Sequence, residues 1–344
     1  MTTFTTTAEA KSSRPAPSNR AGTFFRRQFV IYGILPLLLV VLVAAFGWIE
    51  PRFLSYGNLI NVSRQVSYLG IISLAQMLYL ITRNYDLSNG ATVALSSVSC
   101  ALVMTNTFPD DPAMAIAAGL ASTLVLGLVI GLMNSTLIAV YKINSFMVTL
   151  GVGSAATGVA LLISGGTPVS GLPPAFARYF GGTSVMGIPL PLILFAVVII
   201  AVYVLLNWTR VGRQAYAVGG NDHAAYQAGV NVKRTLFTMM VLGSLFAAFV
   251  GVILTARIST GEANIGLQYP MQSIIACVIG GIALSGGEGR VSGAVMGALF
   301  IVLLSNGMDL IRVQSYVQDI LLGALLVLAL LVDRLRARVR LKPV

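Results

Sequence analysis

Long apolar segments separated by short polar connections dominate this chain of 344 residues. About 20 apolar residues in a helix cross the roughly 30 Å of hydrocarbon in a bilayer. The apolar blocks are continuous and lack the alternation typical of a membrane β-barrel. The pattern predicts an all-α membrane protein, a polytopic bundle of about ten transmembrane helices. The predicted spans are Phe29–Ile49, Leu59–Thr82, Ala91–Thr107, Ala113–Val140, Phe146–Ser164, Ile188–Leu206, Leu236–Ala256, Met271–Leu284, Val291–Met308 and Tyr316–Val332.

The composition excludes an ordinary soluble globule. Hydrophobic residues make up 56% of the chain and charged residues only 10%, and the mean hydropathy is +0.86. A typical soluble domain is about 25% charged. The length leaves no room for a separate soluble domain beside ten spans.

The distribution of basic residues predicts the orientation. An even number of spans puts both termini on one side, and if that side is the cytoplasm, 17 of the 22 basic residues lie inside. This bias agrees with the positive-inside rule, so the net charge of +11 does not call for nucleic-acid binding. The five basic residues at the outer side are Arg52, Arg64, Arg178, Arg257 and Arg312.

The chain divides into one membrane domain and two tails. Residues 1–28, rich in Ser, Thr, Ala and Pro, are expected to form a disordered basic cytoplasmic tail. Residues 29–333 form the transmembrane domain, and residues 334–344 form a second basic cytoplasmic tail. The prolines of the long outer connection, Gly165–Gly187, interrupt any helix there, so it is expected to form an outer rim or cap.

One polar stretch, Thr209–Arg234, lies at the inside face within the loop 208–234. Asn221 is a good helix N-cap, Asp222 suits the positive start of a helix, and Gly229 suits a left-handed residue that closes one. The stretch predicts a short capped helix that docks a partner. His223, the one histidine of the chain, is expected on its surface.

Two of the predicted spans are short and adjoin similar turns. The third follows D-L-S-N-G at Asp86–Gly90, and the eighth runs into L-S-G-G-E-G at Leu284–Gly289. Paired short segments in two halves of a transporter point toward its substrate path. Asp86 is either a helix cap or a charge beside that path. The glycine run lacks the G-K-[ST] of a nucleotide site, so it predicts a tight turn.

The remaining motifs have structural interpretations. Cys100 and Cys277 fall in separate apolar segments and are expected to pack rather than form a disulfide. The two G-x-x-x-G motifs, Gly127–Gly131 and Gly293–Gly297, favour packing within the chain over a dimer face. No catalytic constellation or metal-ligand set is evident, and the deep positions carry almost no charge. We therefore do not expect an enzyme, and we expect the energy for any transport to come from elsewhere.

Four motifs resemble the permease subunits of bacterial ATP-binding-cassette importers for simple sugars, the ribose, xylose and arabinose type. The resemblance extends from about the first span to Val332. One departure is that Arg83, Asn84 and Tyr85 stand where the family usually has glycines and an aliphatic residue, which bears on the flexibility of that turn. The motifs are D-L-S-x-G at Asp86–Gly90, K-I-N-x-F-x-x-T-L-G at Lys142–Gly151, G-R-x-x-Y-A-x-G-x-N-x-x-A-A-x-x-x-G at Gly212–Gly229, and G-G-x-x-L-S-G-G-x-G at Gly280–Gly289.

The resemblance implies a multi-pass protein of the bacterial inner membrane with three kinds of partner. These are an ATP-binding-cassette subunit that carries ATP and Mg, a periplasmic solute-binding protein, and a second permease copy or paralogue. The chain itself is expected to bind no cofactor. The polar loop is implied to contact the ATPase through Gly212, Arg213, Tyr216, Ala217, Gly219, Asn221, Ala224, Ala225 and Gly229.

The substrate is expected to be a monosaccharide or related polyol. Hydroxyl and amide groups beside an aromatic face suit such a ligand. Two other interpretations remain open: a branched-chain amino-acid permease of the same superfamily, and a secondary carrier or channel. The candidate lining of the substrate path is Asp86, Ser88, Asn144, Phe146, Thr149 and Ser285.

Overall fold

The computed structural model describes residues 35–340, so the predicted tail 1–28 and the start of the first span lie outside the described residues. A helix lies at each of the ten predicted positions. Five of these helices are long and apolar enough to cross a membrane. The ten are α2 (Leu35–Ile49), α3 (Tyr56–Ile81), α4 (Asn89–Asn106), α5 (Pro112–Ser135), α6 (Ser145–Ser164), α8 (Leu190–Trp208), α11 (Val232–Ile258), α12 (Tyr269–Ile279), α13 (Val291–Leu310) and α14 (Ser315–Arg340).

The connections contain smaller elements. A 3-10 turn, η1 (Pro51–Leu54), precedes α3, and a π-helical turn, η2 (Thr136–Val140), ends the α5 segment. The predicted outer connection holds α7 (Pro174–Phe176), the π-helical η3 (Ala177–Gly182) and a two-stranded antiparallel hairpin of β1 (Ser184–Val185) and β2 (Ile188–Pro189). The predicted basic tail from residue 334 begins inside α14.

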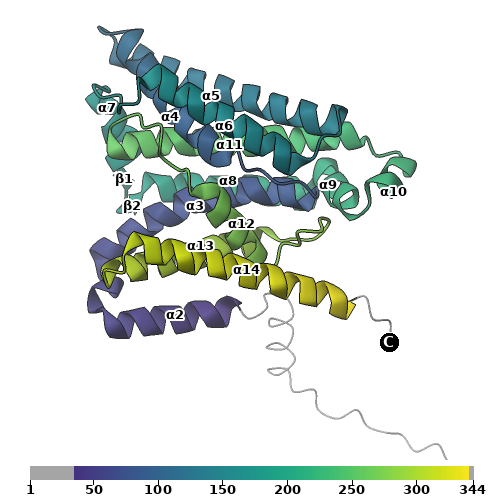
Figure 1. Ribbon diagram of the computed structural model, residues 1–344. Helices are drawn as coiled ribbons and strands as arrows, with labels where there is room; N and C mark the ends of the chain where they lie inside the picture. Colours follow the sequence, from purple (N-terminus) through teal and green to yellow (C-terminus); the bar gives the residue numbers. More distant parts are fainter. Residues whose placement is uncertain (1–34, 341–344) are drawn as a thin grey trace, which may run out of the picture.

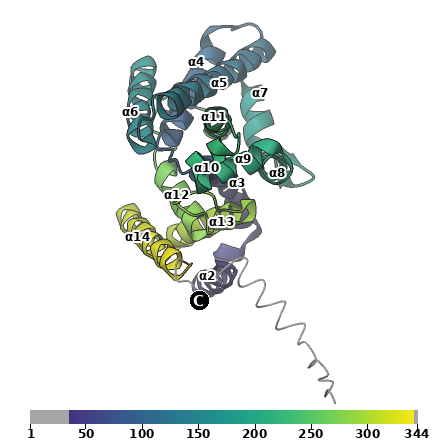
Figure 2. The ribbon, with the colours of Figure 1, turned by 90° about the vertical axis from the view of Figure 1, so that its right-hand side faces the viewer.

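The long helices run side by side, with α3 and α11 in the middle of the bundle (Figures 1 and 2). The helices α4, α5 and α6 pack on one side of this pair, and α2, α13 and α14 lie on the other. Every residue of α3 from Val66 to Ile81 is buried. The core is therefore built around a central helix that is buried on all sides.

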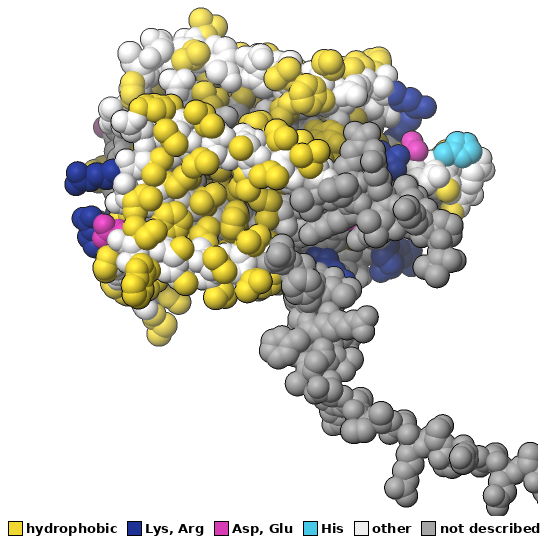
Figure 3. Space-filling model, turned by 60° about the horizontal axis from the view of Figure 1, so that its bottom comes forward, with side chains coloured by type: hydrophobic (Ala, Val, Ile, Leu, Met, Phe, Trp, Pro, Cys, Tyr) yellow, Lys and Arg dark blue, Asp and Glu magenta, His cyan; other side chains and the backbone are white. Residues whose placement is uncertain are grey.

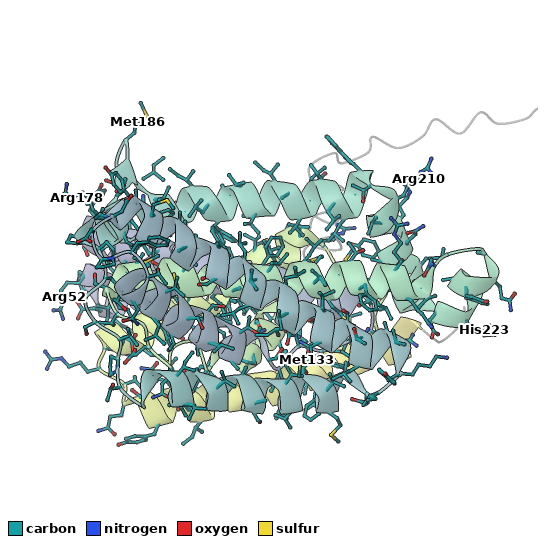
Figure 4. All side chains as sticks on the ribbon, turned by 90° about the horizontal axis from the view of Figure 1, so that it is seen from above. Arg52, Met133, Arg178, Met186, Arg210 and His223 are labelled. Atoms are coloured by element: carbon teal, nitrogen blue, oxygen red, sulfur yellow. The ribbon has the colours of Figure 1, made fainter. Side chains whose placement is uncertain are left out.

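The surface suits a lipid environment. Large apolar side chains of α2, α5, α6, α8 and α14 are exposed. Figure 3 shows hydrophobic side chains spread over one face, with Lys and Arg at its two ends. Figure 4 separates Arg52, Arg178 and Met186 at one end from Arg210 and His223 at the other, as the predicted outer and inner positions require.

Both G-x-x-x-G motifs pack within the chain. A Cβ at Gly127 would lie 2.8 Å from the Cβ of Ala248, and one at Gly131 would lie 2.8 Å from the Cα of Val241, so this motif brings α5 against α11. A Cβ at Gly297 would collide with the backbone carbonyl of Ala276. The second motif therefore brings α13 against α12. The interpretation of packing within the chain is confirmed for both motifs.

Two non-helical segments enter the bundle. Residues 82–88 turn back from the end of α3 to the start of α4. Residues 259–268 run along α4 from its C-terminal half toward its start, because Gly261 contacts Ala101 and Gly266 contacts Val93. These contacts cover about 12 Å of helix rise. The short helices α4 and α12 therefore both begin inside the bundle.

Candidate functional site

The docking segment consists of two helices that leave the bundle at one end. They are α9 (Arg210–Gly220) and α10 (Asp222–Gln227), and His223 of α10 marks the projecting tip in Figure 4. The Asn221 side chain accepts a hydrogen bond from the Ala224 N–H at 2.9 Å, and Gly229 has a φ of +82°. The predicted cap and left-handed residue are therefore confirmed. The sequence did not predict α9 as a separate helix.

The predicted coupling residues divide by exposure. Arg213, Ala217, Asn221, Ala224 and Gly229 are exposed and available to a partner. Gly212, Gly219 and Ala225 are buried and hold the segment against the bundle. A Cβ at Gly219 would collide with the backbone carbonyl of Ile81, so only glycine permits this approach.

Tyr216 fixes α9 to the glycine-rich loop 280–289. Its hydroxyl donates a hydrogen bond to the Gly289 carbonyl at 2.9 Å. Burial raises the pKa of Tyr216 above its usual value, so the hydroxyl keeps the proton that it donates. The docking segment is thus tied to the loop that follows α12.

A cavity of about 1310 Å³ lies beside the docking segment. It separates α10 and the start of α11 from the junction of η2 and α6. Its lining carries three basic side chains, those of Arg83, Lys142 and Lys233, together with polar groups that include Asn144 and Tyr226. The docking segment therefore has open space on this side.

A buried polar cluster surrounds the turn 82–88. The Ser88 hydroxyl donates to Asp86 Oδ1 at 2.6 Å, and the amide of Asn134, on α5, donates to Ser88 Oγ at 2.9 Å. The Thr149 hydroxyl of α6 accepts a hydrogen bond from the Leu87 N–H at 3.0 Å. Three of the predicted path residues, Asp86, Ser88 and Thr149, are thus brought together.

The cluster continues across the start of α4. The side-chain amides of Asn89 and Gln76 meet at 3.1 Å, and the Asn89 amide lies 3.4 Å from the Ser273 hydroxyl of α12. In the alternative orientation of its amide, Gln76 instead donates to the Asp86 carbonyl at 2.9 Å and accepts from the Asp86 N–H at 3.3 Å, so it bonds the backbone of the turn. The polar groups therefore join α3, α4 and α12 at one place.

Sequence reasoning missed Gln76, Asn89, Asn134 and Ser273. Isolated amides inside apolar blocks were the signal, since polar side chains at membrane depth are costly. Three acceptor oxygens of the cluster, Asp86 Oδ2, Asn89 Oδ1 and Asn134 Oδ1, are buried and have no hydrogen-bond partner among the described residues. The Asp86 side chain is 1% exposed. The cluster therefore holds acceptor oxygens whose hydrogen-bonding capacity is unused in this structure.

The other predicted path residues lie apart from this cluster. Asn144 accepts from the Phe146 N–H at 2.9 Å and caps α6 beside the cavity. The Phe146 side chain is 48% exposed on the bundle surface. Ser285 is exposed, and its carbonyl accepts a hydrogen bond from Arg83. Within residues 35–340, no group of three or more His, Cys, Asp or Glu side chains is placed to hold a metal ion.

The family model described as the permease component of branched-chain amino acid transport systems matches residues 58–330. The chain belongs to this permease family. The match covers every helix from α3 to most of α14, and therefore both the docking segment and the buried cluster.

Curated relatives include several sugar permeases. The D-allose transport system permease protein of Escherichia coli K12 is 31% identical over 96% of this chain and 98% of its own length. The ribose import permease protein of Bacillus subtilis is 35% identical over 86% and 90%. The galactose/methyl galactoside import permease protein of E. coli K12 is 34% identical over 90% and 97%. No solved structure matches the chain.

These relatives confirm the resemblance to simple-sugar permeases of ATP-binding-cassette importers. The chain is a multi-pass membrane subunit that transports a solute and is not an enzyme. The alternatives of a secondary carrier or a channel are not favoured by any of these relatives.

We expect Ser88→Ala to destabilise the chain, because it removes the hydroxyl that accepts from the Asn134 amide and donates to Asp86 Oδ1, leaving that oxygen only the Ser88 N–H at 2.8 Å. A buried polar group without a partner costs about 1–3 kcal/mol. Thermal unfolding of the purified chain in detergent measures the change. Ser154→Ala is the matched control, because Ser154 is exposed and bonds only the Leu150 carbonyl of its own helix. Equal melting temperatures for the two variants would contradict the role of the cluster.

Proposed function

We propose that the chain forms half of an alternating-access path for a monosaccharide or related polyol in a bacterial inner membrane. On this proposal it crosses the membrane ten times, with both termini in the cytoplasm. It pairs with a second permease copy or paralogue and receives solute from a periplasmic binding protein. An ATP-binding-cassette subunit docks on α9 and α10 and binds the ATP and Mg.

The docking segment is the observation that carries this proposal. It projects from the bundle at the end opposite Arg52 and Arg178, and it exposes the small side chains of Ala217 and Ala224 (Figure 4). Small residues on a helix allow a partner's groove to approach closely. The glycine run Gly286–Gly289 lacks the lysine and hydroxyl of a nucleotide site, so the energy comes through contact.

The buried cluster supports a polyhydroxylated solute. Sugar hydroxyls would donate to the free oxygens Asp86 Oδ2 and Asn134 Oδ1. The relatives named for ribose, D-allose and galactose point to the same class. The carboxylate of an amino acid would also need a cation as its partner. Among the buried residues of the described chain, the one Asp, Glu, Lys or Arg is Asp86, which is an acid and not a cation.

We expect Ala224→Arg to reduce co-purification of the ATPase subunit by at least about tenfold. Ala224 is exposed, so arginine at this position would bring an unpaired charge into the interface. A loss of about 1.4 kcal/mol in binding free energy already lowers the affinity tenfold. Met186→Arg is the control, because Met186 is 98% exposed at the other end of the bundle. Full recovery of the ATPase with the Ala224 variant would contradict docking on α10.

The orientation is tested by thiol labelling with a membrane-impermeant reagent. Cys100 and Cys277 are both buried, so labelling of the parent chain is expected to be weak. Met186→Cys is expected to react in intact spheroplasts, whereas His223→Cys reacts only after the membrane is opened. The reverse order of reactivity would contradict the proposed topology.

A further inference from the structure

Three segments of backbone, far apart in sequence, meet at the end of α3. The Gly287 N–H donates to the Ile81 carbonyl at 2.8 Å. Gly219 packs directly on the Ile81 carbonyl, and a Cβ at Gly286 would lie 2.8 Å from the Gly219 carbonyl. The end of α3, the end of α9 and the glycine-rich loop are therefore in direct backbone contact.

One side chain joins all three segments. Arg83 Nε donates to the Ser285 carbonyl at 2.7 Å, and Arg83 Nη2 donates to the Gly220 carbonyl at 3.2 Å. The backbone of Arg83 has a φ of +61°, a conformation uncommon for a non-glycine residue. Two residues later, the Tyr85 hydroxyl donates to the Leu284 carbonyl at 3.3 Å. We call the Arg83 side chain with the carbonyls of Gly220 and Ser285 the clasp.

Each segment held by the clasp leads to a different part of the mechanism. Gly220 directly precedes Asn221, the cap of the docking helix α10. Arg83 lies in the turn 82–88, which carries Asp86 and leads into α4. Ser285 lies in the loop that follows α12. Because Asn89 of α4 and Ser273 of α12 meet in the buried cluster, the clasp joins the docking helix to both walls of that cluster.

Toward α6 the docking helix has no such tie. The cavity of about 1310 Å³ lies between α10 and the junction of η2 and α6. Lys142 at that junction also has a left-handed backbone, with a φ of +56°, but its side chain makes no hydrogen bond or ion pair among the described residues. A displacement of α10 can therefore pass to the α3 side of the bundle and not to the α6 side.

We propose that Arg83 is the positioning residue that transmits movement of the docking helix to the turn 82–88 and to the loop after α12. The inference rests on the proposed function. When the ATPase draws α10 away, the Gly220 carbonyl pulls the guanidinium, and the guanidinium moves both the Asp86 turn and the Ser285 loop. The planar fork of arginine suits this task, because it fixes two carbonyls at once, whereas lysine offers a flexible point charge.

The test uses the full assembly of this chain with its ATPase and binding protein in proteoliposomes. Arg83→Ala and Arg83→Lys are compared with the parent chain for ATPase recovery, ATP hydrolysis and ATP-dependent uptake of the solute. We expect ATPase recovery and basal hydrolysis within about twofold of the parent, and uptake per ATP hydrolysed lowered at least about fivefold, the lower range for coupling between sites. Lys142→Ala is the matched control and is expected to leave that ratio unchanged.

Several results would overturn the proposal that Arg83 transmits this movement. Normal uptake per ATP in both Arg83 variants would show that the movement takes another route. If Lys142→Ala lowers uptake per ATP hydrolysed as much as the Arg83 variants do, the effect comes from the charge of the cavity alone. If Arg83→Ala lowers the melting temperature of the chain, uptake per ATP hydrolysed is judged from Arg83→Lys alone, because lysine keeps the charge and most of the volume of arginine. No ATP-dependent uptake by the parent assembly would overturn the proposed function itself.

Discussion

The structure depends on one constraint: backbone polar groups inside hydrocarbon must find partners within the protein. Continuous helices meet it by themselves, but the segments 82–88 and 259–268 do not. Side chains supply the missing bonds, because Ser145 and Thr149 accept from the N–H groups of Tyr85 and Leu87, and Ser97 accepts from the N–H of Glu262. Polar residues are therefore concentrated around these two non-helical segments. On the proposed function, hydrogen bonds to a sugar would be made at the same place.

The same two non-helical segments separate the packed central helices from the helices that begin inside the bundle. The central pair α3 and α11 is buried along most of its length, whereas α4 and α12 begin inside the bundle and each follow a non-helical connection. Glycines with positive φ at Gly281, Gly286 and Gly287 permit sharp turns beside the docking segment. On the proposed function, contact with a partner at α10 would act near these turns and not on the packed core.

Much of the fold could be predicted from the sequence, because long apolar blocks and helix caps are local signals. The ten helical positions, the Asn221 cap and the left-handed Gly229 are examples. The partners in the buried cluster could not be predicted, since Ser88 and Asn134 are 46 residues apart and Asn89 and Ser273 are 184 residues apart. For the same reason the sequence marked Arg83 as a departure from its family without indicating the carbonyls that it binds.

The central claim is that this chain moves solute only when a separate ATPase acts on it through contact. Uptake of a labelled monosaccharide into proteoliposomes, with the purified chain alone or with its ATPase and binding protein, tests the claim most directly. The account predicts uptake that requires all components and ATP. Uptake by this chain alone, independent of ATP, would contradict it.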